Sequence, residues 1–199
     1  AHYETADPSG VTLPFVMFFL AAAGALTITG PVAPDLLAVP RRGLLLGAKA
    51  AVTGLLGLAG GLFFAALTVA GAMILVGDRP APIDPWPAWT DAVPGILCAA
   101  LVAAATVVVG LGLGAVLRSP AATLSTLGGV LLVAPAFTFF LPDPWEQRAG
   151  SVLLPNLTPQ LAGGDHPYLL SPPGAAAVLI AYVLIALTAG TLAFRHRDV

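Results

Sequence analysis

The chain has 199 residues, of which 58% are hydrophobic and only 9% are charged, and its formal net charge is −2. Soluble domains usually carry about 25% charged residues, so the composition excludes an ordinary soluble fold, and the small net charge indicates no nucleic-acid partner. Cys98 is the only cysteine, which excludes an intrachain disulfide.

Five long apolar runs follow one another along the chain, and each exceeds the roughly 18 residues that a helix needs to cross a bilayer. They cover residues 11–30, 46–77, 93–117, 121–141 and 174–194. The runs are uniformly apolar, whereas a strand of a membrane barrel alternates over about ten residues. Helices also satisfy their own backbone polar groups, as lipid requires. The sequence therefore predicts one all-α domain over residues 1–199: a polytopic membrane bundle of five transmembrane helices with a short amphipathic or re-entrant helical segment.

Basic residues gather at one end of this predicted bundle. If the five spans alternate, one side of the membrane holds Arg41, Arg42, Lys49, Arg118, Arg195 and Arg197. The positive-inside rule makes that side cytoplasmic. We therefore expect a multi-pass protein of the cell (inner or plasma) membrane, with the amino end of this chain outside and its carboxyl end in the cytoplasm.

The first cytoplasmic loop, residues 31–45, is bounded by prolines and is long enough for a short surface helix. We predict this helix over residues 35–42, because Asp35 near its start suits the helix dipole. Arg41 and Arg42 then have two interpretations. They dock on a cytoplasmic partner protein, or they only anchor the loop to anionic lipid.

The outer loops are richer in aromatic residues and acids. Residues 78–91 form a proline-rich loop in which Trp86 and Trp89 are expected to anchor the chain at the membrane interface.

Residues 142–173 form the longest loop, and we predict an amphipathic helix over 145–154 within it. Its apolar side is expected to comprise Trp145, Val152, Leu153 and Leu154. Its composition is typical of a plain interfacial anchor. A family resemblance described below implies instead that this helix, with Pro155 and Asn156, forms part of an extracellular gate.

The spans contain few residues that carry chemistry. No Asp, Glu, His, Lys or Arg lies in the middle of any span, whereas ion-coupled transporters normally keep such groups there. No nucleophile is paired with a base, and the three histidines lack metal-ligand spacing, so we predict no catalytic residue, no metal and no cofactor. In the fourth span Pro135 should kink the helix. The hydroxyls of that span either face a polar pathway or bond back to their own helix; they belong to Thr123, Ser125, Thr126 and Thr138.

Two pairs of glycines are spaced four residues apart inside the spans: Gly57 with Gly61, and Gly110 with Gly114. Small residues at this spacing let helices approach closely in lipid. They serve either packing within this subunit or a face for a second one. Gly110, Gly112 and Gly114 also resemble half of a nucleotide-binding fingerprint, but they lie in an apolar run and follow no strand, so we reject that function.

An ordered set of short motifs resembles the permease subunits of type-2 ATP-binding-cassette (ABC) exporters, in particular the drug-export-like forms of actinobacteria. The motifs are, in chain order, Ile28-Thr29-Gly30, Leu37-Ala38-Val39-Pro40-Arg41-Arg42, Ala48-Lys49-Ala50, the 110–117 stretch before Arg118, Trp145 through Leu154-Pro155-Asn156, and Phe194-Arg195-His196-Arg197-Asp198. The first cytoplasmic loop departs from the family pattern, because it is shorter and lacks the usual Glu-Tyr pair.

The resemblance implies a six-span subunit whose first span is not in this sequence, a second permease subunit, and two cytoplasmic ABC ATPase subunits. It also implies that the first cytoplasmic loop is the coupling element and that short re-entrant helices after the fourth of the five spans cap the exit path. The substrate would be hydrophobic or amphipathic. Two other functions stay open: a non-transporting scaffold or assembly subunit, and a passive channel.

Overall fold

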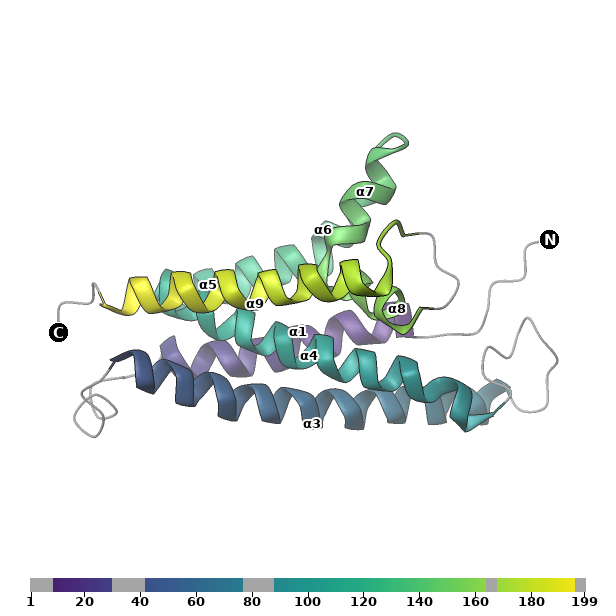
Figure 1. The fold of residues 1–199 in the computed structure, drawn as a ribbon, viewed down its shortest axis with the longest axis horizontal. Coiled ribbons are helices and arrows are strands. Elements are labelled where there is room, and N and C mark those ends of the chain that lie inside the picture. Colours follow the sequence, from purple (N-terminus) through teal and green to yellow (C-terminus); the bar gives the residue numbers. More distant parts are fainter. Residues whose placement is uncertain (1–8, 30–41, 77–87, 164–167, 196–199) are drawn as a thin grey trace.

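The computed structural model of the chain describes residues 9–29, 42–76, 88–163 and 168–195 (Figure 1). These residues are almost entirely helical, and none of them forms a strand, which confirms the predicted all-α class. Five helices in this part of the chain are long and apolar enough to cross a membrane: Val11–Thr29, Gly43–Leu75, Trp89–Leu117, Pro120–Thr138 and Pro172–Ala193. The chain is therefore built as a polytopic helical membrane protein.

In chain order the elements are α1 (Ser9–Thr29), α3 (Arg42–Val76), α4 (Trp89–Leu117), α5 (Pro120–Gly128), the π-helical turn η1 (Gly129–Val133), α6 (Ala134–Thr138), α7 (Trp145–Val152), the 3-10 turn η2 (Leu154–Asn156), α8 (Leu157–Ala162) and α9 (Pro172–Arg195). Figure 1 shows the long helices running along one axis, α8 lying near one end of the bundle, and α7 projecting away from the bundle's side.

Helix α4 is the centre of the bundle. It packs against α1, α3 and α9, and 56% of its spanning residues are buried, compared with 17% in the span that α9 forms. Its buried side chains are mostly Ala, Val and Gly. Small side chains bring neighbouring backbones close, which favours helix association where the hydrophobic effect between helices is absent.

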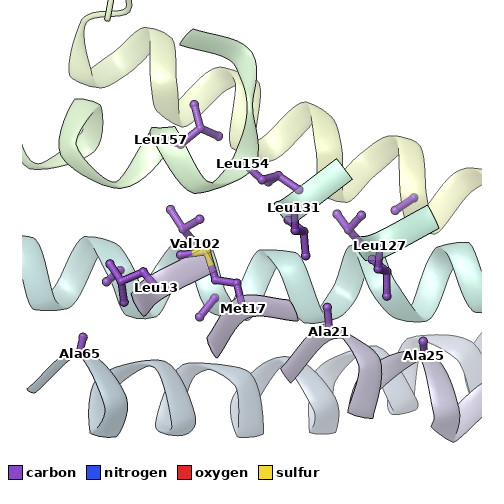
Figure 2. Close-up of a cluster of buried hydrophobic side chains, with 14 of the residues drawn as sticks. Leu13, Met17, Ala21, Ala25, Ala65, Val102, Leu127, Leu131, Leu154 and Leu157 are labelled. Carbon is purple, nitrogen blue, oxygen red and sulfur yellow. The ribbon is translucent and has the colours of Figure 1, made fainter. Parts of the chain in front are cut away.

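The larger of two apolar clusters lies where α1, α4, η1 and the short helices meet (Figure 2). Met17 of α1 and Leu131 of η1 are fully buried there. Leu154 and Leu157, from the turn between α7 and α8, reach into the same cluster and are also buried. The segment between the fourth and fifth spans is thus part of the core.

The second span begins earlier than the sequence predicted. The loop was placed over 31–45, but α3 already begins at Arg42. Leu45 and Leu46 explain the difference, because both are buried in the second apolar cluster, against Ile28 and Leu111. Similarly, Trp89 was placed in an outer loop but is the first residue of α4, whose first turn also contains Asp91.

The fourth span is interrupted where a kink was expected at Pro135. The chain forms the π-helical turn η1 directly before α6, and the helix ends at Thr138, earlier than the predicted boundary of the 121–141 span. Proline has no N–H for the helical ladder, and π turns are one way in which a helix accommodates such a defect.

Candidate functional site

One region of the described structure is richest in hydrogen bonds between side chains and the backbone of other elements. We call it the short-helix segment, and it comprises α7, η2 and α8 (residues 145–162). The predicted helix over 145–154 is corrected in two respects. Helix α7 ends at Val152, and Leu153 is extended, with φ −73° and ψ 135°. Pro155 is the physical reason, because it cannot donate a helical hydrogen bond to the carbonyl of Ser151.

The predicted apolar face is also divided. Trp145 and Val152 are exposed, whereas Leu154 is buried and Leu153 is half-buried. The break after Val152 therefore turns the second half of the segment toward the bundle and leaves the first half of α7 pointing away from it.

Ending α7 at Val152 leaves its last carbonyls without helical partners. Side chains donate hydrogen bonds to three consecutive carbonyls, the first of which, Gly150 O, also accepts from Leu153 N at 3.2 Å. Asn156 Nδ2 donates to Gly150 O at 3.0 Å, Gln160 Nε2 donates to Ser151 O at 2.9 Å, and Tyr182 Oη donates to Val152 O at 3.0 Å. Asn156, expected as a gate residue, thus caps the helix before it.

Gln160 is the centre of this network and is fully buried. Besides Ser151 O, its Nε2 donates to Asn156 O at 2.8 Å, and its Oε1 accepts from Leu170 N at 3.0 Å. Both ends of the amide are therefore satisfied, as a buried polar group requires. Because Leu170 precedes α9, the side chain of Gln160 ties the short helices to the start of the last span.

Ser151 adds a second link between α7 and the residues that precede α9. Its Oγ donates to Gln147 O at 2.6 Å and accepts from Leu169 N at 2.8 Å. Beside it, Gly150 faces the Tyr168 ring, which a Cβ on that glycine would approach to 3.2 Å. Burial raises the pKa of the Tyr168 phenol above its ordinary value.

Tyr182 shows how far along α9 the short-helix segment extends. It lies ten residues after the start of α9 at Pro172, which is about 15 Å along a helix at 1.5 Å per residue, and it still contacts the end of α7. Helix α8 packs against α4 and α9, and η2 packs against α1 and α4. The η2 and α8 parts of the segment therefore pack against the spans at one end of the bundle.

The predicted packing glycines all lie between helices of this chain. A Cβ on Gly57 would come within 2.7 Å of Val107, and one on Gly61 within 2.8 Å of the Ala100 backbone, both on α4. A Cβ on Gly114 would approach Ile28 of α1 to 2.8 Å, and one on Gly110 would overlap the Ala21 backbone. The described structure therefore uses all four for packing within the subunit.

Gly112, which the sequence analysis did not place among the packing glycines, also lies between two helices. A Cβ there would lie 2.5 Å from Ala186 O, so this residue brings α9 against α4. The alternation in the 110–114 stretch is thus explained: its first and third glycines face α1, and the middle one faces α9.

At the opposite end of the bundle, two basic side chains donate hydrogen bonds to carbonyls near the ends of neighbouring helices. Lys49 Nζ donates to Thr27 O, in the last turn of α1, at 2.7 Å. Arg118 donates through Nη2 to Ala193 O, in the last turns of α9, at 3.0 Å. Cations favour helix C-termini because of the dipole. Of the predicted coupling residues, Asp35 and Arg41 lie outside the described residues, and Arg42 is the first residue of α3.

Arg118 occupies the left-handed region, with φ 57°, at the end of α4. This conformation usually falls to glycine and costs a residue with a side chain about 1 kcal/mol. The guanidinium contact with α9 offsets that cost. The predicted tight turn through Ser119 and Pro120 follows, and Ser119 Oγ accepts from Ala122 N at 3.3 Å to begin α5.

Most hydroxyls of the fourth span bond back to their own helix. Thr123 donates to Ser119 O, Thr126 to Ala122 O and Thr138 to Pro135 O. Within the described residues, no group of three His, Cys, Asp or Glu side chains is placed to hold a metal ion. The threonine side chains of the fourth span thus give no sign of a polar pathway along it.

Sequence reasoning missed Gln160, Ser151 and Tyr182. One signal was available: a proline at 155 removes the N–H that would bond the carbonyl of residue 151, so this carbonyl needs another donor. Comparison of the chain with known protein families, with curated proteins and with solved structures gives no match. The proposed function therefore rests on the sequence and the fold of this chain.

Proposed function

We propose that the chain is a membrane-spanning permease subunit of an ABC exporter, which moves a hydrophobic or amphipathic substrate outward with ATP hydrolysed by a separate subunit. The observation that carries the proposal is the short-helix segment. It connects the fourth and fifth spans, and its η2 and α8 pack against α1, α4 and α9, in the part of the chain for which the resemblance implies short re-entrant helices that cap an exit path.

The distribution of charged groups supports a transporter that is powered from outside the chain. Lys49 and Asp91 are the acidic or basic side chains within the five described spans, and both lie near a helix end. Lys49 bonds a helix carbonyl, and Asp91 accepts from Ala88 N at the start of α4. Ion-coupled transporters place such groups inside the membrane, so an ATPase partner is the better energy source.

In this proposal the basic end of the bundle faces the cytoplasm and the short-helix segment faces outward. The residues at 31–41 and the beginning of α3 contact the ATPase, and a second permease subunit completes the pathway. Nothing in the sequence resembles a phosphate-binding Gly-Lys-Ser/Thr loop, so the proposal assigns ATP hydrolysis to the partner.

The first test is co-purification with an ATPase encoded by a neighbouring reading frame. The variant Arg41→Glu/Arg42→Glu is expected to abolish co-purification and to leave the permease folded. The matched control is Arg195→Glu/Arg197→Glu, which reverses the same amount of charge on the same proposed side. Loss in the first variant alone supports a docking role for the loop. Retention in both supports lipid anchoring by the two arginines.

The second test separates a transporter from a scaffold. Vesicles that contain the complex should move a hydrophobic dye outward only when ATP is present, and a catalytic-site variant of the ATPase should abolish the movement. An ATPase that co-purifies but never drives movement would support the scaffold. Dye movement without ATP would support a passive channel.

A further inference from the structure

The tip of the projecting part of the molecule is strongly aromatic. It comprises Phe137, Phe139, Phe140 and Trp145, which we call the aromatic tip. These side chains are 65%, 74%, 84% and 58% exposed, respectively. Phe137 and Phe140 also contact each other, with ring centroids 6.2 Å apart. Such a concentration of exposed aromatic surface on one projection needs cover from outside the chain.

The aromatic tip follows an exposed apolar side of the fourth span. Val130, Val133 and Phe137 lie on this exposed side. Phe139 and Phe140, beyond the end of α6, are also exposed. Figure 1 shows that the chain here leads into α7, which projects from the side of the bundle.

Charged residues come soon after the two phenylalanines, Phe139 and Phe140, in the sequence. The first charged side chain after the fourth span is Asp143, and Glu146 and Arg148 follow in α7. Trp145 lies at this boundary, and the Arg148 guanidinium carbon lies 5.6 Å from the centre of its ring. Tryptophan is enriched where hydrocarbon meets headgroups, and a neighbouring arginine can reach the phosphate layer.

The size of the aromatic tip argues against a second copy as its cover. A standard protein interface buries about 800 Å² on each partner. Four aromatic side chains of about 150–250 Å² each, already partly buried, cannot supply that area alone. A lipid surface has no such minimum area.

We propose that the aromatic tip is a membrane-interface anchor, which inserts Phe139 and Phe140 among the lipid acyl chains and holds Trp145 and Arg148 at the headgroups. The anchor fixes the depth of α7 relative to the bilayer. Because the short-helix segment is tied to α9 through Gln160 and Tyr182, it also connects that segment to the lipid surface. The proposal is independent of whether the chain is an exporter.

The test uses the full chain in phosphatidylcholine vesicles, with Trp86→Phe and Trp89→Phe leaving Trp145 as the only tryptophan. Lipids brominated near the glycerol end of their acyl chains are expected to quench Trp145 more strongly than lipids brominated near the methyl end. Aqueous acrylamide should quench it weakly. The variant Phe139→Asp/Phe140→Asp should reduce quenching by the brominated lipids and increase quenching by acrylamide.

Two results would overturn the proposal. Strong acrylamide quenching without quenching by brominated lipid would place the aromatic tip in water. Protection from both quenchers would place it under protein, as in a contact with a second copy. Because the double Asp variant can disturb folding, a second version replaces all three natural tryptophans by Phe and introduces Phe140→Trp. This reporter should be quenched by brominated lipid more strongly than Trp145, since it lies deeper in the proposed anchor.

Discussion

The amide of Gln160 makes a strong prediction about stability. In the variant Gln160→Leu a side chain of similar size replaces the amide, so the hydrogen bonds are lost with little change in volume. Ser151 O and Leu170 N then lose the partners at 2.9 and 3.0 Å that the amide gave them. Each buried main-chain group left unpaired costs about 1–3 kcal/mol, and apolar burial of the leucine offsets part of this, so we expect a loss of about 2–4 kcal/mol.

Thermal unfolding in detergent, followed by tryptophan fluorescence, measures this loss as a fall in Tm of roughly 5–10 °C. Hydrogen exchange should locate it, with faster exchange of the Leu169 and Leu170 amides. Gln147→Leu is the matched control, because this exposed glutamine lies on the same segment. Surface changes of that kind usually stay within about 0.5 kcal/mol.

A second control removes a polar group that has no partner. Thr158 is buried on α8, and its hydroxyl makes no hydrogen bond. Thr158→Val should therefore leave Tm unchanged or raise it. Equal Tm values for Gln160→Leu and Gln147→Leu, with unchanged exchange before α9, would refute the assignment of Gln160 as the centre of the network.

Three other predictions concern separate features. Gly110→Ala should destabilise the bundle by about 1–3 kcal/mol, because a Cβ there overlaps the backbone of α1, whereas Gly71→Ala, with open space around its Cβ position, should not lower Tm in the same unfolding assay. Tyr182→Phe removes the donor to the last carbonyl of α7 and should speed hydrogen exchange at the end of that helix without changing exchange in α4. In a chain whose natural cysteine is replaced by Ser, an impermeant thiol reagent added to intact cells should label Asp7→Cys and spare Arg197→Cys; the reverse pattern would invert the proposed orientation.

The five spans could be predicted because hydropathy is a local property, and a long apolar run needs no knowledge of its neighbours. The ends of spans were less predictable. At the start of α3, Arg42 suggested loop, but Leu45 and Leu46 are held in the helix by residues of α1 and α4. Such contacts join parts of the chain that are distant in sequence, so no local pattern contains them.

Some features of the candidate site could likewise be predicted from the sequence, and others could not. The importance of the stretch from Trp145 to Asn156 could be expected from its composition. The role of Pro155 in ending α7 follows from proline chemistry alone. The bond from Gln160 to Leu170 could not be foreseen, because it depends on how the chain turns after the break. The single amphipathic face was wrong for the same reason, since it assumed one continuous helix.

The packing of α4 has a mechanical consequence. Gly110, Gly112 and Gly61 place its backbone directly against α1, α9 and α3, respectively. Backbones in such contact cannot slide past one another without first separating. Those four helices should therefore move as one stiff body in any conformational change.

The fourth span is differently held. It contacts α1 and α4 through α5 and η1, and Gly129 has open space around its Cβ position. Its π turn also places a weak point in the helical ladder near mid-span. Bending at this turn would swing α6 and the aromatic tip against the stiff body. The fourth span is therefore the compliant element of this bundle, and the other four spans are its frame.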